Sequence, residues 1–304
     1  MANKIAFING KGGCGKTTSI FHISGILSTR DKRVLAIDFD KQRNTSDSLL
    51  MNSEFPDSTV FDVMNGQPFE KATARALFQS RGKANPKYYG TDCLPADIRL
   101  EDESLLANVD AAHFGDMLDE FIEGQGYEWV LVDMPPSNRS LNDICFANVV
   151  DYLIVPFSSD VFSVSGYGDI METVQRARAL NPSLNILGIY LSRYMANCGV
   201  DRYIREQLLN YDTFIDVQIP HAADIREGIF YGRPINYYKE RVIQSWVSEN
   251  GMNNFKNDGS FIEVMKTKRS LSSPPKYLVK HIQPSIHAYE RLVSEIKARI
   301  RSLR

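Results

Sequence analysis

Short apolar runs alternate along this chain with segments in which apolar residues recur at helical spacing. An apolar run of about four to eight residues between turn residues is typical of a strand, whereas a 3.6-residue period is typical of a helix. The predicted strands are Ile5–Ile8, Val34–Asp38, Tyr88–Leu94, Trp129–Asp133, Tyr152–Phe157, Asn185–Leu191 and Phe214–Ile219. The predicted helices are Ile20–Leu27, Phe114–Ile122, Gly168–Leu180, Asp201–Leu209, Ala223–Tyr231 and Ser285–Leu303.

This alternation predicts an α/β fold with a doubly wound, mostly parallel sheet flanked by helices. Several strands are continuous apolar runs, as expected where both faces of a parallel sheet are buried. In such a sheet, ligands bind at the carboxyl ends of the strands. We expect residues 1–304 to form one domain, with an atypical segment rich in Asn, Gly, Ser and Lys at about 245–280 and a basic amphipathic helix at about 285–303.

A glycine-rich loop follows the first predicted strand. Residues 10–17 read Gly-Lys-Gly-Gly-Cys-Gly-Lys-Thr and match the phosphate-binding pattern G-x-x-x-x-G-K-[ST]. The strand before it and the helix after it favour a nucleotide loop over a turn that binds nothing. We expect Lys16 to reach the β- and γ-phosphates and the Thr17 hydroxyl to bind Mg²⁺. The nucleotide contacts predicted from this loop are Gly12, Gly13, Cys14, Gly15, Lys16, Thr17 and Thr18.

Two more predicted strands end in carboxylates. Val34–Asp38 leads into Asp38-Phe39-Asp40, and Trp129–Asp133 ends in Asp133. Two carboxylates after a buried strand can serve a metal and a water. An aspartate after four apolar residues has the Walker B arrangement, in which the carboxylate orients Mg²⁺ or its water shell. A strand that simply ends in a polar turn is the alternative.

The run from Lys11 to Thr18, Lys-Gly-Gly-Cys-Gly-Lys-Thr-Thr, resembles the deviant Walker A loop of the ParA/MinD ATPases, with the ParA-type partition ATPases as the nearest members. The resemblance implies that Lys11 crosses a dimer interface to the partner's nucleotide, so that two subunits sandwich two ATP molecules. A lysine from each side would offset the phosphate charge at the two-fold axis. It further implies that Asp38 lies near Mg²⁺ through water and that Asp40 positions the attacking water. Lys11, Lys16 and Asp40 are thus the expected catalytic residues, and Thr17, Asp38 and Asp133 the expected metal site.

The resemblance covers roughly residues 2–242 and resumes in the last helix. Asp133-Met134-Pro135-Pro136-Ser137 is similar to the family's Walker B stretch. Ile219-Pro220-His221 is similar to the region that closes over adenine, which implies that Pro220 and His221 lie beside the base. A loop that packs on its own sheet is the alternative for these two residues.

The chain departs from the family in one place. Where the family usually reads Asp-Pro-Gln-Gly, this chain reads Asp40-Lys41-Gln42-Arg43. Losing the proline frees the loop's backbone, and the two added cations are candidates for contact with phosphate or with a partner. A non-hydrolysing ATP switch is therefore an open alternative to an ATPase.

Charge is distributed unevenly along the chain. Residues 239–304 contain 13 Lys and Arg against 6 Asp and Glu, whereas residues 1–238 contain 22 against 31. A basic end suggests an anionic partner. Three interpretations of the last helix remain open: a docked helix with solvated arginines, a basic surface for DNA phosphates, and a membrane-surface helix. We do not expect the third, because the apolar face lacks Phe and Trp. The basic side chains concerned are Arg291, Lys297, Arg299, Arg301 and Arg304.

Composition narrows the class of protein. Hydrophobic residues make up 43% and charged residues 24%, which is ordinary for a globular chain. We find no apolar run of about 18 residues and no signal peptide, which favours a cytoplasmic protein, and the resemblance to ParA-type ATPases implies that it associates with the nucleoid. The four cysteines form no C-x-x-C pair. An electron-delivery protein of the nitrogenase iron-protein kind would need a cysteine at a dimer axis, and Cys145 is the candidate.

The resemblance implies a ParA-type ATPase for DNA partition. Its cofactors would be ATP and Mg²⁺, and its ATP state would be a homodimer that binds DNA without sequence preference. A ParB-like centromere-binding protein would stimulate hydrolysis. The alternative is a MinD-like spatial regulator that binds a membrane or a secretion or division machine.

Overall fold

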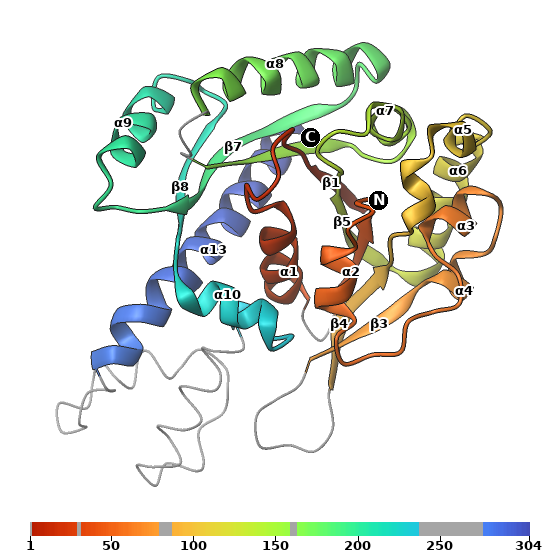
Figure 1. The fold of residues 1–304 in the computed structure, drawn as a ribbon, viewed down its shortest axis with the longest axis horizontal. Helices are drawn as coiled ribbons and strands as arrows, with labels where there is room; N and C mark the ends of the chain where they lie inside the picture. Colours follow the sequence, from red (N-terminus) through yellow and green to blue (C-terminus); the bar gives the residue numbers. More distant parts are fainter. Residues whose placement is uncertain (1, 29–31, 79–86, 159–162, 237–275) are drawn as a thin grey trace, which may run out of the picture.

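A single sheet of eight strands forms the centre of the molecule (Figure 1). The computed structural model describes residues 2–28, 32–78, 87–158, 163–236 and 276–304. The order of strands across the sheet is β3-β4-β2-β5-β1-β6-β7-β8. Their bounds are β1 Asn3–Phe7, β2 Arg33–Asp38, β3 Ala74–Phe78, β4 Lys87–Leu94, β5 Tyr127–Asp133, β6 Tyr152–Phe157, β7 Asn185–Tyr194 and β8 Phe214–Pro220.

The mostly parallel, doubly wound sheet predicted from the sequence is confirmed. Every neighbouring pair of strands is parallel except β3 and β4, which are antiparallel. All the predicted strands are present, and among the strands of the described residues β3 is the one that the pattern missed. As an edge strand, β3 pairs with a single neighbour and mixes buried with partly exposed positions. Its run therefore lacks the continuous apolar character of the central strands.

Helices cover both faces of the sheet, so the described chain forms three layers (Figure 1). One face carries α3 Val60–Met64, α4 Phe69–Ala72, the 3₁₀ turn η1 Ile98–Glu101, α5 Glu103–Leu106, α6 Ala111–Gln125, α7 Arg139–Asn148, α8 Ser163–Leu180 and α9 Gly199–Leu208. The other face carries α1 Lys16–Leu27, α2 Asn44–Leu49, α10 Ala223–Phe230 and α13 Lys276–Leu303.

Two hydrophobic cores result from the alternation of side chains along each strand. Within β1 and the residue after it, Ala6 and Ile8 enter the core under α6–α9, whereas Ile5 and Phe7 enter the core under α1 and α13. The central strands are buried on both faces, as their continuous apolar runs predict. This burial holds the carboxyl ends of β1, β2 and β5 rigidly side by side.

The final helix docks on the sheet, as the first interpretation of its sequence expected, and the interpretation as a surface for DNA phosphates stays a prediction. Tyr289, Leu292 and Ile296 are buried in the core that it shares with α1 and β8. The membrane-surface interpretation of this apolar face is wrong, because the sheet already covers it. The helix begins earlier than predicted, at Lys276, and continues through Pro284.

Arg299 was expected among the basic surface side chains, and that expectation is wrong. Its guanidinium donates hydrogen bonds to the carbonyl oxygens of Leu187 at 2.7 Å and Phe214 at 2.8 Å. Arg299 therefore joins α13 to β7 and β8. Arg291 and Arg301 are exposed on the same helix.

The atypical segment at about 245–280 lies outside the described residues except for its last part. Residues 276–280 form the beginning of α13. The assignment of the whole chain to one domain stays a prediction. In the part of the chain that the structure describes, no helix combines the length and the apolar character needed to cross a membrane.

Candidate functional site

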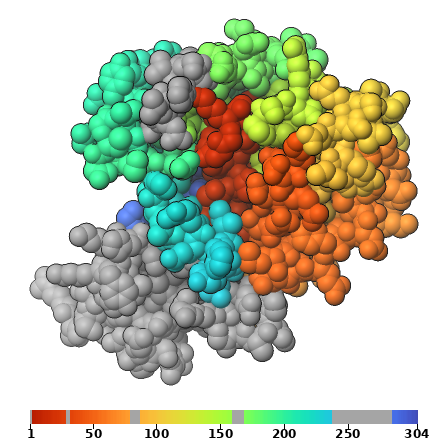
Figure 2. Space-filling view, in the orientation of Figure 1, coloured from red at the N-terminus to blue at the C-terminus, as the bar shows by residue number. Residues whose placement is uncertain are grey.

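The glycine-rich loop lies between β1 and α1, beside a cavity of about 820 Å³ at the carboxyl ends of the strands. In Figure 2 the red N-terminal segment lies in a hollow of the surface, between segments from the first, middle and last parts of the chain. Gly13 and Gly15 have positive φ angles of 76° and 95°. A Cβ on Gly15 would lie 3.1 Å from Ser192 Oγ, so glycine is needed there for both conformation and space.

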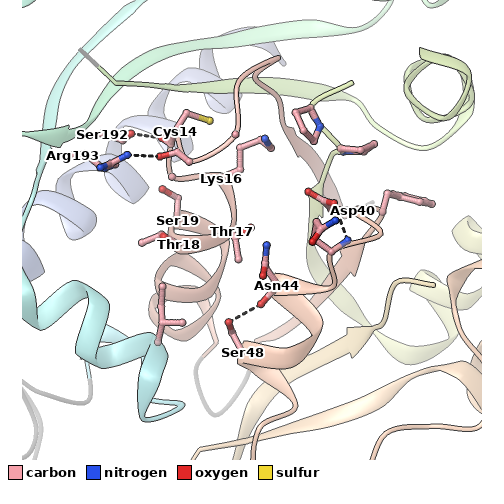
Figure 3. A pocket seen from close by; sticks show the side chains of 18 of the residues that line it. Cys14, Lys16, Thr17, Thr18, Ser19, Asp40, Asn44, Ser48, Ser192 and Arg193 are labelled. Atoms are coloured by element: carbon pink, nitrogen blue, oxygen red, sulfur yellow. Dashed lines mark hydrogen bonds between the residues drawn. The ribbon is translucent and has the colours of Figure 1, made fainter. Parts of the chain in front are cut away.

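Three side chains that the sequence did not point to hold this loop in shape. The Asn9 amide donates to the carbonyl of Pro156 at 2.8 Å and accepts the backbone N–H of Lys11 at 2.9 Å. From the end of β7, the Ser192 hydroxyl donates to the Cys14 carbonyl, and Arg193 donates to the Gly13 carbonyl at 3.0 Å (Figure 3). These bonds turn loop carbonyls outward toward β7, which leaves the loop's N–H groups available for an anion.

Lys16 is buried although it carries a charge. Its side chain is 6% exposed and its ammonium group donates to the Asn9 carbonyl at 3.3 Å. A buried lysine is rare unless it has an anionic partner. In Figure 3 the side chain extends into the space between the loop and the segment around Asp40. The ammonium group is therefore already placed where phosphates on the loop would meet it.

Asp38 and Asp133 lie next to each other at the ends of β2 and β5, where the register pairs their Cα atoms. Both side chains are fully buried. Asp133 Oδ2 accepts a hydrogen bond from the Thr17 hydroxyl at 2.6 Å. Asp38 accepts the backbone N–H groups of Asp40 at 3.0 Å and Ser46 at 2.8 Å, and the Ser46 hydroxyl at 2.7 Å.

Burial makes charge costly at both carboxylates. Burial, together with the negative charge of Asp133, raises the pKa of Asp38 to about 8. Burial also raises the pKa of Asp133, although the Thr17 hydroxyl opposes that rise. A divalent cation beside the pair would favour the charged form of both groups.

The donor atoms at this point fit Mg²⁺. Asp133 Oδ1 is buried and accepts no hydrogen bond from the described residues, so it has lone pairs available for a metal or its water. The Thr17 hydroxyl lies beside it and offers a second oxygen for such a metal. Mg²⁺ uses one or two protein oxygens together with phosphates and waters. Among the described residues no three His, Cys, Asp or Glu side chains converge on one point.

The segment after β2 also lines the cavity. Asp40 lies at its edge, and one of its carboxylate oxygens accepts the backbone N–H of Gln42 at 3.0 Å. Lys41 forms an ion pair with Glu101. Arg43 lies over the ring of Phe55 at 4.7 Å and has a φ angle of 58°. In this chain the two added cations thus contact side chains of the same molecule.

Pro220 and His221 line the far end of the same cavity, where β8 passes into α10. The backbone N–H of His221 donates to the carbonyl of Tyr194 at 3.0 Å, which ties this turn to the end of β7. Ile225, Ile229 and Tyr289 give the cavity an apolar wall beside them. A flat, mostly apolar base fits such a wall.

Lys11 is half-exposed and does not line the cavity of its own chain. A role for its ammonium group at a partner's nucleotide stays a prediction. Cys145, by contrast, is fully buried in the core under α7, so it cannot reach a surface between two subunits. The cysteine on which the iron-protein alternative depends is therefore not placed for that role.

A family model described as an AAA domain matches residues 2–186. The chain belongs to the ParA/MinD family of ATPases. It is 29% identical over 241 residues to the chromosome partitioning protein ParA of Caulobacter vibrioides, which covers 77% of this chain and 86% of that protein. It is also 29% identical over 235 residues to the chromosome-partitioning ATPase Soj of Thermus thermophilus, and the match covers 76% of this chain and 86% of that protein. As a ParA/MinD protein this chain is an ATPase.

Solved structures share the fold of this ParA/MinD ATPase. The cobyrinic acid a,c-diamide synthase of Mycobacterium smegmatis, with a bound ATP analogue and magnesium, matches with a TM-score of 0.63 at 23% identity, covering 84% of this chain and all 100% of that one. A putative plasmid partition protein of Borrelia burgdorferi bound to AMPPNP matches with a TM-score of 0.60 at 17% identity. The match covers 96% of this chain and 99% of that one. At these identities the likeness shows the fold alone.

Proposed function

We propose that this protein is a partition ATPase whose ATP-bound homodimer binds DNA without sequence preference. The observation that carries the proposal is the glycine loop, held beside the buried pair Asp38 and Asp133, in a chain similar to partitioning ATPases. In this proposal a ParB-like centromere-binding partner stimulates hydrolysis. Release from DNA follows, and the cycle places the protein on the nucleoid in the cytoplasm.

Each part of the site has a role in this scheme. Residues 12–18, Lys16 among them, would hold the phosphates, Thr17 and Asp133 would hold Mg²⁺, and Asp38 would act on the metal through water. The metal, when bound, neutralises phosphate charge. Asp40 orients the attacking water from its place at the cavity edge. The protein thus acts by positioning and charge stabilisation, which are the main sources of rate in phosphoryl transfer.

Dimerisation depends on Lys11 in this proposal. Each subunit would bring the phosphates of one ATP to a two-fold axis, and Lys11 of each would offset the charge held by the other. The exposed arginines of α13, Arg291 and Arg301, are candidates for DNA phosphates. A dimer doubles such a basic surface, so a weak contact in each subunit becomes useful only in the ATP state.

Sedimentation velocity with a hydrolysis-resistant ATP analogue tests the proposal. We expect a monomer without nucleotide, a dimer with the analogue, and co-sedimentation of the dimer with nonspecific DNA. The Lys11→Ala variant should bind the analogue and stay monomeric. A wild-type protein that remains monomeric with the analogue bound would contradict the sandwich dimer. Binding to anionic liposomes instead of plasmid would favour the MinD-like alternative.

A further inference from the structure

A second hydroxyl contacts the carboxylate that fits Mg²⁺. Thr45, in the first turn of α2, donates from its Oγ1 to Asp133 Oδ2 at 2.6 Å. The Thr17 hydroxyl donates to the same oxygen, also at 2.6 Å. Thr45 is fully buried and comes from a part of the chain outside the glycine loop. Its contact with Asp133 was not evident from the spacing of any motif.

The two hydroxyls leave Asp133 with one usable oxygen. Oδ2 accepts two short hydrogen bonds, whereas the buried Oδ1 accepts none from the described residues. A buried carboxylate with two donors on one oxygen has a fixed orientation, because rotation would break both charge-assisted bonds. Thr45 therefore determines that Oδ1 is the oxygen left for a metal or its bound water.

The same turn of α2 contacts the second buried carboxylate. Ser46 donates both its backbone N–H and its hydroxyl to Asp38 Oδ2, at 2.8 Å and 2.7 Å. The segment from Asp40 leads directly into this turn, and Figure 3 shows α2 beginning at Asn44, beside Thr17. The position of α2, and with it the segment that carries Asp40, thus depends on the carboxylates at the metal end of the cavity.

We propose that Thr45 is a positioning residue for Mg²⁺: it aligns Asp133 for the metal and links metal binding to the segment that carries Asp40. The inference rests on the binding of ATP and Mg²⁺ at the site proposed above. Hydrogen-bond partners of metal-binding groups typically change metal affinity by about 10- to 100-fold when they are removed. Thr45 acts through Asp133 and has no role in holding the phosphates themselves.

The test is a Mg²⁺ titration of nucleotide binding by the full-length protein, followed with a fluorescent, hydrolysis-resistant ATP analogue. We expect Thr45→Val to need about tenfold more Mg²⁺ for half-maximal binding, whereas binding in EDTA stays as in the wild type. Thr45→Ser keeps the hydroxyl and should restore the wild-type curve. Amide hydrogen exchange at residues 41–46 should slow on adding Mg²⁺ to the nucleotide complex, and Thr45→Val should lose this slowing.

Thr91→Val is the matched control, because Thr91 is equally buried and its hydroxyl lies 3.5 Å from the Ser24 carbonyl, away from both carboxylates. It should titrate with Mg²⁺ as the wild type does. Any of three results would overturn the inference. The Mg²⁺ titration curves of Thr45→Val and the wild type could coincide, or Thr91→Val could shift as far as Thr45→Val does. Thr45→Val could also lose as much nucleotide binding in EDTA as it loses in Mg²⁺. If Thr45→Val does not fold, the same Mg²⁺ titration of Thr45→Ala, compared with Thr45→Ser, tests the inference. A wild type that binds no nucleotide at any Mg²⁺ concentration would instead overturn the proposed function.

Discussion

Buried polar side chains lie at the start and in the middle of the first helix, α1. Lys16 begins α1 at the phosphate loop, and His22 lies further along it, fully buried. His22 Nδ1 accepts the backbone N–H of Ile235 at 3.0 Å, and Nε2 therefore carries the proton that faces the Ile225 carbonyl at 3.0 Å. The ring is the neutral tautomer, and it ties α10, through Ile225, and the segment after α10, through Ile235, to α1.

His22 should make the stability of the apo protein depend on pH. Burial lowers the pKa of His22 to about 4, below the value of about 6.5 expected for the unfolded chain. Protonation thus favours the unfolded state, so the contribution of His22 to stability is complete above pH 6.5 and is lost as the pH falls toward 4. The loss should reach up to about 3 kcal/mol.

Urea unfolding at a series of pH values, compared between wild type and His22→Gln, measures this effect. The comparison is needed because the raised pKa of Asp38 acts in the opposite direction over the same pH range. The difference in unfolding free energy between the two proteins should narrow as the pH falls from 6.5 to 4. A constant difference would show that His22 does not titrate as its burial requires.

At the residue scale, the sequence predicted the members of the glycine loop but not the side chains that hold it. Gly13 and Gly15 belong to a contiguous pattern, and each has the positive φ angle that such a loop needs. Asn9 precedes the pattern, and Ser192 and Arg193 come from β7. A contact between β7 and the loop depends on the order of strands, which no local spacing records.

At the scale of elements, α13 shows that burial determines which charged side chains of a helix make structural contacts and which face solvent. Its periodic apolar face predicted an amphipathic helix, and Tyr289, Leu292 and Ile296 do face the core. The pattern did not distinguish Arg299, which bonds to two strand carbonyls, from Arg301, which is exposed. Both are arginines on one helix, and only packing separates their roles.

Arg299→Ala and Arg301→Ala should therefore have different effects. Removing Arg299 leaves the carbonyls of Leu187 and Phe214 without their donor, which should lower the free energy of unfolding by roughly 1–3 kcal/mol. Arg301→Ala should change it by less than about 0.5 kcal/mol. Under the proposed function, Arg301→Ala weakens DNA binding and reduces its salt dependence. Chemical unfolding measures the stability of the two variants, and DNA titration at several salt concentrations measures their binding. Equal losses of stability in Arg299→Ala and Arg301→Ala would contradict the different roles assigned to the two arginines.

Short elements escaped the sequence pattern for a related reason. The helices α2, α3, α4 and α5 span four to six residues each, too few to show a 3.6-residue period. α7 is longer and begins at an Asn138 cap that accepts the N–H of Leu141, a signal that was present in the sequence. Of these elements α2 matters most, because it carries Thr45 and Ser46.

On the scale of the whole molecule, the sheet brings together three strand ends that are far apart in the chain. β1, β2 and β5 are neighbours, so the glycine loop, Asp38 and Asp133 meet at one edge. The cavity formed there extends from Asp40 to His221. A ligand that filled it would contact segments from both halves of the chain.

Under the proposed function, Asp40→Ala should separate nucleotide binding from ATP hydrolysis. Asp40 lines the cavity but is absent from the hydrogen bonds that hold Thr17, Thr45 and Asp133 together. Its removal should lower ATP turnover by about a hundredfold or more, as loss of a residue that orients the nucleophile does. Nucleotide binding should persist, and the protein should stay on DNA in the presence of ATP. A turnover equal to that of the wild type, in a phosphate-release assay, would remove Asp40 from its proposed role.

The sequence by itself determined the α/β class, the parallel core strands and the position of the phosphate loop, because each depends on short-range periodicity or on a contiguous motif. Tertiary structure alone decided which side chains support that loop, which oxygen of Asp133 is left for a metal, and which arginines of α13 reach solvent. These features arise where separate segments meet in a low-dielectric core, and hydrogen bonds there connect residues whose spacing along the chain follows no period.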